Sequence, residues 1–279
     1  MKNAMQFKAR IKKAAQENKI SAQLVLQNYM LERFLERLSV SAYRDKFIIK
    51  GGFLIGSLAG IDSRTTMDID ATIKSFPLER DRISKAISEI AGMSLNDDIS
   101  FRFDKLEDIR EQDQYSGFRA TLHAEFPPLS VPLKIDITAG DKITPKEISY
   151  RHQLMFEDRS ISILAYNLST LLAEKLETVI SRGSQSTRPR DYYDIYILSR
   201  LQGQNIDYAE LKKAIEATSE HRNSSGAIKD YREIIGNAAK NPEMNKYWDN
   251  YRRTFSYAAG ISFKAACDAV IAIMERIYK

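Results

Sequence analysis

Two acidic residues, Asp68 and Asp70, follow a glycine pair, Gly51 and Gly52, at a spacing suited to phosphate chemistry. If residues 67–73 form a strand, its period of two puts both carboxylates on one face, about 7 Å apart. Carboxylates held this close repel each other unless a cation lies between them. Their oxygens are ligands for Mg²⁺, and a glycine turn opening a helix offers backbone N–H groups to phosphate. The stretch predicts a metal and phosphate site; the alternative is a plain turn beside exposed acids.

A third acidic residue, Asp136, lies in a second alternating segment, residues 131–138. If this segment is a strand, Lys134, Asp136 and Thr138 share one face and the apolar residues point to the other. Asp136 could then join the first two acids. The alternative is a local ion pair between Asp136 and Lys134.

Hydrophobic periodicity predicts the elements that hold these residues. The pattern indicates an α/β domain over residues 1–150, followed by a mostly helical domain over residues 151–279. In the first domain we expect helices at 21–40, 53–58 and 79–91 and strands at 67–73, 99–103, 118–126 and 131–138, with residues 47–49 a strand or a short connector. In the second we expect helices at 168–182, 191–202, 207–218, 226–239 and 263–278.

Composition narrows the class of protein. At 279 residues, with 43% hydrophobic and 28% charged residues, the chain has the profile of a soluble globular protein. Cys267 is the single cysteine, which excludes an intramolecular disulfide and fits a reducing compartment. No apolar run is long enough to cross a bilayer, and the N-terminus lacks the apolar region of a signal peptide. We therefore expect a cytoplasmic protein without membrane contact.

Charge is distributed unevenly along the chain. Basic and acidic residues number 11 and 4 over residues 1–50, 12 and 17 over 51–150, and 19 and 16 over 151–279. An acidic centre between basic flanks suits an enzyme that acts on nucleotides or nucleic acid, because the flanks attract phosphate. The alternative is that the basic helices are solvated faces. The three histidines have no metal-ligand spacing, and we assign them no role.

Four stretches together resemble the AbiEii/AbiGii-type toxins, nucleotidyltransferases of type IV toxin–antitoxin and phage-abortive systems that include the MenT-type toxins. The stretches are LERFLERLSVS with FIIKGG (31–52), RTTMDID (64–70), KIDI (134–137), and LLAEKLETVISRG with RPRDYYDIYIL (171–198). The resemblance implies a nucleotidyltransferase-type mixed sheet with flanking helices in residues 1–150. It also implies that residues 151–279 complete the active-site cleft.

The same resemblance implies the chemistry. A nucleoside monophosphate would pass from an NTP to an acceptor hydroxyl, such as the 3′ end of tRNA, with Mg²⁺ or alternatively Mn²⁺ as cofactor. Asp68 and Asp70 would hold the metal, and Asp136 would complete the metal site or act as the base. Arg64 and Thr66 would contact the phosphates or orient the first aspartate, with a structural salt bridge as the alternative.

Further implied residues lie in the helical domain. Lys175 would act as a point charge on the NTP phosphates, against the alternative of a solvated helix face. Asp191 and Asp194 share one helix face. One of them would position Lys175 or contact the nucleotide, and the other would cap the helix; the sequence leaves this assignment open. Arg190, in the basic turn before them, is a candidate nucleotide contact.

The implied partners are an NTP, an RNA acceptor and an AbiEi-like antitoxin encoded nearby, with the toxin itself a monomer. The implied reaction is of the EC 2.7.7 type and would arrest growth. The rival hypothesis is a toxin or regulatory protein that binds GTP or another nucleotide and acts through a partner without transfer.

Overall fold

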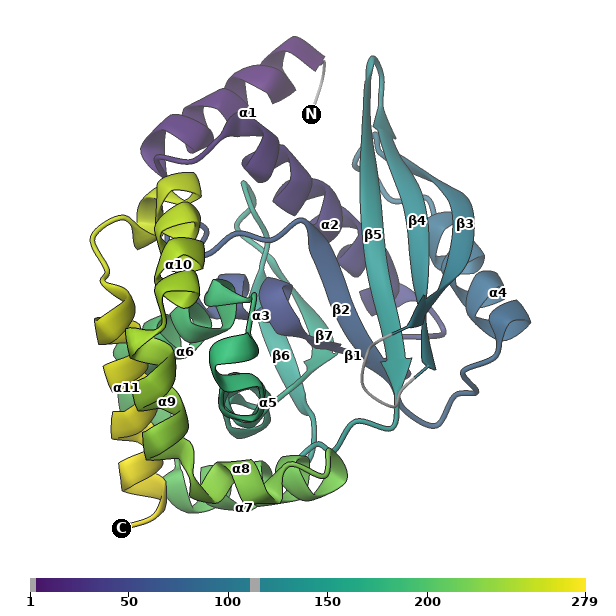
Figure 1. The fold of residues 1–279 in the computed structure, drawn as a ribbon. Helices are drawn as coiled ribbons and strands as arrows, with labels where there is room; N and C mark the ends of the chain where they lie inside the picture. The colour runs from purple at the N-terminus through teal and green to yellow at the C-terminus, as the bar shows by residue number, and fades with distance from the viewer. Residues whose placement is uncertain (1–3, 111–115) are drawn as a thin grey trace. The chain divides into compact units, whose positions relative to one another are not determined.

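The computed structural model describes residues 4–110 and 116–279, and the chain divides into two compact units (Figure 1). Unit 1 consists of Met1–Asp141 and Ile148–Ala165, and unit 2 of Lys142–Glu147 and Tyr166–Lys279. The sequence pattern predicts the domain boundary at residue 150. In the structure this residue lies in a strand-rich segment that belongs to unit 1.

Unit 1 is built on one mixed sheet, in which seven strands of the described chain follow the order β3-β4-β5-β2-β1-β7-β6. Strand β2 is central: it pairs antiparallel with β1 and parallel with β5. The strands are β1 (Phe47–Lys50), β2 (Asp68–Ile73), β3 (Ser100–Arg110), β4 (Ser116–Phe126), β5 (Leu129–Ala139), β6 (Ile148–Gln153) and β7 (Ser160–Ala165).

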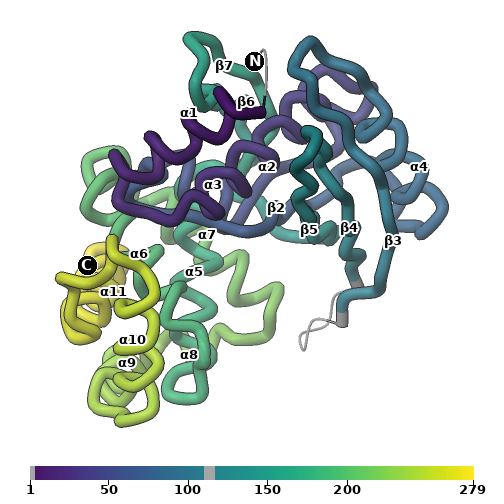
Figure 2. Tube along the Cα trace, turned by 90° about the horizontal axis from the view of Figure 1, so that it is seen from above, coloured from purple at the N-terminus to yellow at the C-terminus, as the bar shows by residue number. Residues whose placement is uncertain are grey.

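Helices α2 and α4 contact each other and lie behind the sheet in the view of Figure 1, and Figure 2 shows the same layer from above. The side chain of Ser21 caps α2 by accepting the backbone N–H of Leu24. Helix α3 follows β1 without a loop and contacts both β1 and β2. The helices of this unit are α1 (Ala4–Glu17), α2 (Ala22–Val40), α3 (Gly51–Ala59) and α4 (Arg80–Ala91).

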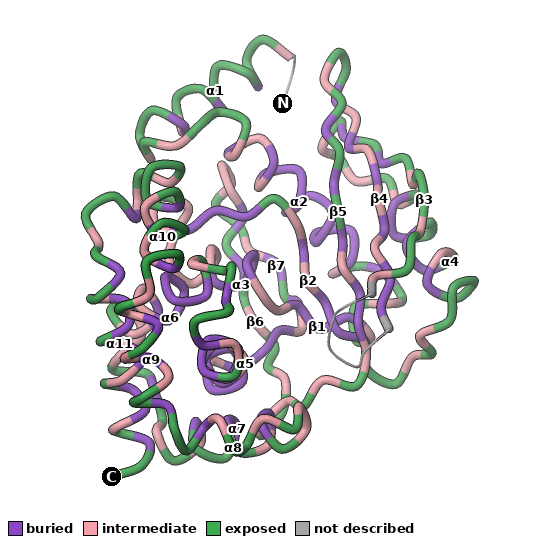
Figure 3. The backbone as a smooth tube through the Cα atoms, viewed as in Figure 1, coloured by how far each residue is buried: buried purple, intermediate pink, exposed green. Residues whose placement is uncertain are grey.

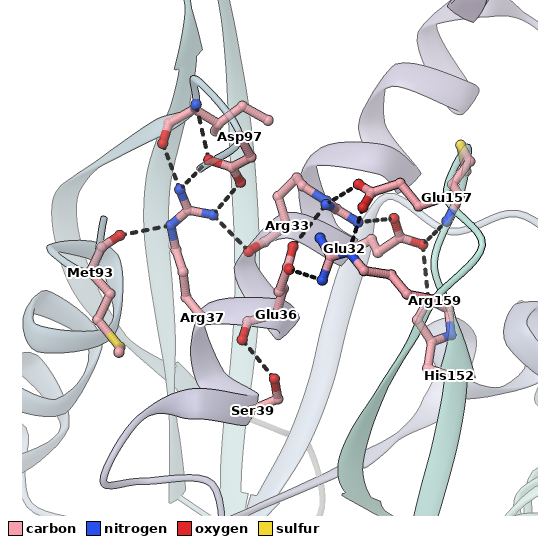
Figure 4. Close-up of polar contacts among 12 residues, drawn as sticks. Glu32, Arg33, Glu36, Arg37, Ser39, Met93, Asp97, His152, Glu157 and Arg159 are labelled. Atoms are coloured by element: carbon pink, nitrogen blue, oxygen red, sulfur yellow. Dashed lines mark hydrogen bonds and ion pairs between the residues drawn. The ribbon is translucent and has the colours of Figure 1, made fainter. Parts of the chain in front are cut away.

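Buried charges fix α2 on both sides, in addition to the buried apolar residues along it (Figures 3 and 4). Arg37 donates two hydrogen bonds, of 2.8 and 2.9 Å, to the carboxylate of Asp97, which precedes β3. On the other side, Glu32 pairs at 3.0 Å with Nε2 of His152 on β6, whose Nδ1 lies 2.6 Å from Oγ of Ser57 on α3. Because buried charges are costly to separate, these contacts fix α2 and α3 relative to the sheet.

Unit 2 is helical in its described residues and is organised around α5, whose N-terminus is capped by Asn167 through the backbone N–H of Thr170. Helix α5 packs against α6 and α7, and α11 packs against α6 and α9. Figure 3 shows the buried residues along α5. The helices are α5 (Leu168–Arg182), α6 (Pro189–Leu201), α7 (Tyr208–His221), α8 (Ser225–Lys229), α9 (Tyr231–Lys240), α10 (Pro242–Thr254) and α11 (Phe263–Ile277).

The predicted mixed α/β architecture is confirmed, but three local expectations were wrong or incomplete. Residues 148–165 form the hairpin β6 and β7, although the chain from residue 151 onwards was expected to be mostly helical. The buried Ile161, Ile163 and Ala165 alternate with more exposed residues, which is strand periodicity. The predicted helix 226–239 is two helices that meet at Asp230. Helices α1 and α10 were not anticipated.

Candidate active site

Four charged residues form a row across the sheet of unit 1. Lys50 on β1 is in register with Asp70 on β2, Asp70 with Asp136 on β5, and Asp136 with Arg119 on β4. Residues directly opposed across neighbouring strands project from the same face of a sheet. The register therefore brings two predicted acids side by side between two basic residues, with Asp68 on the same face of β2.

Asp70 lies against the first turn of α3. The backbone N–H of Gly52 donates to Oδ2 of Asp70 at 3.3 Å, and Gly51 has a φ of +63°. A Cβ atom on Gly51 would lie 2.0 Å from the same Oδ2. The first glycine is therefore required both for its left-handed backbone and for space, and the helix N-terminus favours the negative charge beside it.

Asp68 is oriented by the segment that precedes it. The Thr66 hydroxyl donates to Oδ1 of Asp68 at 2.8 Å, which is the orienting contact that the sequence left open against a phosphate contact. The Thr66 carbonyl in turn accepts a 3.0 Å hydrogen bond from Nδ2 of Asn28 on α2. Gln27, the neighbour of Asn28, donates at 3.0 Å to the carbonyls of Met67 and Pro132. Helix α2 therefore fixes the segment that enters β2 and the first half of β5.

Asp136 is bound by Arg119 and not by Lys134, so the alternative of a local pair with Lys134 is wrong. Nε and Nη2 of Arg119 donate to the two oxygens of Asp136 at 2.7 and 2.6 Å. Lys134 is instead in register with Asp68 and Thr121. The hydrogen bond with Asp136 raises the pKa of Arg119 above its ordinary value, against partial burial, and the charges of all three acids contribute.

Lys50, at the other end of the row, forms an ion pair with Asp141, which follows β5 in the chain. Its Nζ lies 2.5 Å from Oδ2 of Asp141, and the hydroxyl of Thr138 donates to the same oxygen at 3.1 Å. Burial raises the pKa of Asp141, but the charge of Lys50 and the hydrogen bonds from Lys50, Thr72 and Thr138 outweigh it and hold that pKa below its ordinary value. This pair ties β1 to the end of β5.

Arg64, a predicted phosphate contact, is only 2% exposed. Its guanidinium donates to the carbonyl of Thr65, and a Cβ on Gly52 would lie 3.1 Å from its Nη2 and 2.8 Å from Oγ1 of Thr66. Arg64 therefore packs beneath the glycine pair. This burial favours a role in supporting the turn over direct phosphate contact.

In unit 2, one ammonium group joins two predicted acids on α6. Nζ of Lys175 lies 2.5 Å from Oδ1 of Asp191 and 3.0 Å from Oδ2 of Asp194, and the Asp194 side chain is fully buried. Arg188 is the N-cap residue of α6, so neither aspartate holds the N-cap position expected for one of them. Arg190 is exposed in the first turn of α6.

The described chain holds no preformed group of three or more His, Cys, Asp or Glu side chains that could bind a metal ion. No helix among residues 4–110 and 116–279 is long and apolar enough to cross a membrane. A hollow of about 600 Å³ lies in unit 2, between α7, α8 and α9. Its lining includes Glu216, Lys229 and Tyr278 but none of the predicted site residues.

Comparison with known families decides the class of protein. The model of the nucleotidyl transferase AbiEii toxin family, of type IV toxin–antitoxin systems, matches residues 33–269. The chain belongs to this family. It is therefore a nucleotidyltransferase toxin, and membership implies an NTP substrate and an antitoxin partner.

Solved structures support the same fold. MenT4, a nucleotidyltransferase toxin from Mycobacterium tuberculosis, is similar with a TM-score of 0.55 and 14% identity, over 97% of this chain and 98% of that chain. JHP933 from Helicobacter pylori is similar with a TM-score of 0.51 and 12% identity, over 92% and 94%. At such identities the likeness shows the fold alone. A search of curated proteins gave no match.

Four residues of the site were missed by the sequence analysis: Lys50, Arg119, Gln27 and Asn28. The alternation of residues 118–126 places Arg119 on the polar face of a predicted strand, but its partner depends on the register with β5. Gln27 and Asn28 lie in the predicted helix 21–40, where polar residues are usually solvated. Nothing local to them indicates their hydrogen bonds to the acid-bearing segment.

Proposed function

We propose that this toxin transfers a nucleoside monophosphate from an NTP to an acceptor hydroxyl in a Mg²⁺-dependent reaction of the EC 2.7.7 type. The observation that supports the proposal is the register of Asp70 with Asp136, with Asp68 on the same face of β2 and the N-terminus of α3 against Asp70. Phosphoryl transfer needs acidic metal ligands beside a phosphate-binding backbone, and this is such a combination.

The residues present fit a hard divalent cation. The three aspartates supply carboxylate oxygens, the donors that Mg²⁺ and Mn²⁺ prefer. Asp136 already binds the guanidinium of Arg119 through both carboxylate oxygens, so a positive group is accommodated beside the acids. Asp68 and Asp70 are the proposed metal ligands. Asp136 is proposed as a third ligand or as the base.

When bound, the metal would neutralise phosphate charge and stabilise the leaving pyrophosphate. The protein's own contribution is to orient the reactants. The acceptor oxygen attacks the α-phosphorus, and the bond between that phosphorus and the oxygen bridging to the β-phosphate breaks. The proton of the acceptor hydroxyl passes to Asp136 if this residue is the base. Gly51 and Gly52 begin α3, whose N-terminal dipole favours a phosphate group.

Lys175 is the proposed cationic contact to the NTP phosphates, with Arg190 as a further contact. Asp191 and Asp194 both bind Lys175, so we propose that the pair holds the ammonium group in one orientation. The fully buried Asp194 is the stronger candidate for positioning, because a buried carboxylate depends on its ionic partner. The more accessible Asp191 remains a candidate for nucleotide contact.

For the acceptor we propose RNA, specifically the 3′ end of tRNA, and for the partner an AbiEi-like antitoxin that neutralises a monomeric, cytoplasmic toxin in a phage-defence setting. The resemblance described above supports these assignments, and the net charge of +5 agrees with an RNA acceptor.

The direct test incubates the purified protein with Mg²⁺, each of the four α-labelled NTPs in turn, and total cellular RNA. We expect label to move from at least one NTP onto RNA of tRNA size. Asp70→Asn should abolish the transfer while the circular dichroism spectrum stays unchanged, since the substitution preserves shape. Asp62→Asn, at an acid in the loop before β2, is the matched control and should remain active.

Absence of label on any RNA with all four NTPs would contradict the proposal. Tight nucleotide binding without a product would then favour a toxin that acts by binding, particularly if toxicity survives Asp70→Asn. Lys175→Met tests the helical unit separately: the KM for the NTP should rise about tenfold or more if the ammonium group binds phosphate.

A further inference from the structure

The ion pair between Arg119 and Asp136 has a geometry that a static structural role does not require. It is bidentate, with distances of 2.7 and 2.6 Å, yet the Arg119 side chain is 38% exposed and that of Asp136 18%. Partly exposed ion pairs contribute little to stability in most proteins. The guanidinium is therefore well oriented, but its ion pair with Asp136 adds little to the stability of the fold.

The position of Arg119 in the charged row is also specific. It lies directly opposite Asp136, which is itself in register with Asp70, so one guanidinium faces the acids that would hold the metal. Asp68 lies on the same face of β2 as Asp70, so a third carboxylate shares this side of the sheet. A cation entering among these acids would compete with Arg119 for Asp136.

Arginine has a second kind of partner available in a nucleotidyltransferase. Its planar fork binds phosphate oxygens in the same bidentate manner as carboxylate oxygens, and it stays charged at any working pH. A triphosphate that brings a divalent cation to the acids would offer Arg119 a new anionic partner as it loses Asp136.

We infer that Arg119 takes the place of the metal at Asp136 in the nucleotide-free protein and moves to the NTP phosphates when metal and nucleotide bind together. The inference rests on the proposed function, because it assumes that the acids bind the metal. Arg119 then binds the substrate, and in the absence of nucleotide it weakens the binding of metal to Asp136. Metal and NTP then favour each other's binding through one side chain.

The test measures Mn²⁺ binding to the nucleotide-free protein by the electron paramagnetic resonance signal of free Mn²⁺. Arg119→Gln removes the competitor, so we expect it to bind Mn²⁺ about threefold to fivefold more tightly, the scale of a partly exposed ion pair. The same variant should show a KM for the NTP raised about tenfold or more at saturating metal. Arg102→Gln is the matched control: it removes an arginine of the neighbouring β3 whose ion pair with Asp104 is outside the row.

Unchanged or weaker Mn²⁺ binding by Arg119→Gln would overturn the inference, as would a KM for the NTP that does not change. Asp70→Asn separates this failure from that of the proposed function. If Asp70→Asn loses Mn²⁺ binding while Arg119→Gln matches the wild type, the metal site stands and the role of Arg119 is refuted. If Asp70→Asn binds Mn²⁺ normally, the proposed metal site itself is refuted.

A second readout follows the guanidinium directly. The Nε–H resonance of Arg119, assigned by its loss in Arg119→Gln, reports its hydrogen-bond partner in a ¹⁵N spectrum. It should shift when Mg²⁺ and a nonhydrolysable NTP are added together and change little with Mg²⁺ alone at low concentration. A resonance that keeps its position in the ternary complex would mean that Arg119 stays on Asp136, against the inference.

Discussion

Replacing Gly51 by alanine should disable catalysis more than it harms the fold. The Cβ atom added by Gly51→Ala would lie 2.0 Å from Oδ2, 2.7 Å from Cγ and 2.9 Å from Cβ of Asp70. Real Cβ atoms do not approach heavy atoms closer than 3.0 Å, so the carboxylate must move by about 1 Å. A rotation of the Asp70 side chain alone does not relieve the contact, because its own Cβ is also too close.

The magnitudes follow from this geometry. An alanine at a φ of +63° costs about 1–2 kcal/mol, and the steric contact adds about 1–3 kcal/mol, so we expect the free energy of unfolding to fall by about 3 kcal/mol. A displacement of about 1 Å in a group that positions the reactants, as proposed for Asp70, lowers kcat by about 100-fold. Urea unfolding measures the first quantity and label transfer from the preferred NTP the second.

The matched control is Gly236→Ala in the middle of α9, where an added Cβ has no neighbour within 4 Å. This variant should be more stable by about 0.5–1 kcal/mol, because alanine favours a helix, and fully active. The reasoning is refuted if Gly51→Ala folds and keeps its kcat within threefold of the wild type. Such a result would mean that the position of Asp70 beside the glycine does not matter for the reaction.

Three further predictions concern stability and reactivity. Because the pKa of Asp141 is depressed in the folded protein, its contribution to the free energy of unfolding is present above the ordinary aspartate pKa of about 4 and is lost as pH falls through the lower folded value. Urea unfolding at decreasing pH should therefore show a smaller loss of stability towards acid for Asp141→Asn than for the wild type. Gln27→Ala removes two hydrogen bonds to the acid-bearing segments and should lower the free energy of unfolding by about 1–2 kcal/mol and also kcat, whereas a loss of stability with full kcat would contradict its positioning role. Burial raises the pKa of the Cys267 thiol to about 12, so a thiol reagent at pH 8 should modify the protein only after unfolding, and rapid modification of the folded protein would contradict this burial.

Local patterns were sufficient to predict the acid-bearing strands. Asp68 and Asp70 alternate with the buried Ile69 and Ala71, a period of two that is visible in the sequence. The glycine pair was visible too, since a left-handed backbone at Gly51 is typical of that residue. The elements that carry the candidate site were therefore predictable from neighbouring residues.

The contacts between elements were not predictable in the same way. The pair of Arg119 with Asp136 depends on the register of β4 and β5, and a shift by one residue would send Arg119 to the other face. The ion pairs of Lys175 with both Asp191 and Asp194 depend on how α5 packs against α6. The strand β7 was missed because its short alternation competes with the helical periodicity that follows it.

The position of β2 between β1 and β5 also has a consequence for how the protein is made. The charged row is complete only when β1, β2, β4 and β5 have all paired, and β5 is separated from β2 by a helix and two strands. Such parallel, long-range pairing forms slowly, because the intervening chain must be closed into a loop first. A nascent chain that has not yet paired β2 with β5 holds Asp70 and Asp136 apart. If Asp70 and Asp136 act together as proposed, transfer activity should therefore begin only when the sheet has closed.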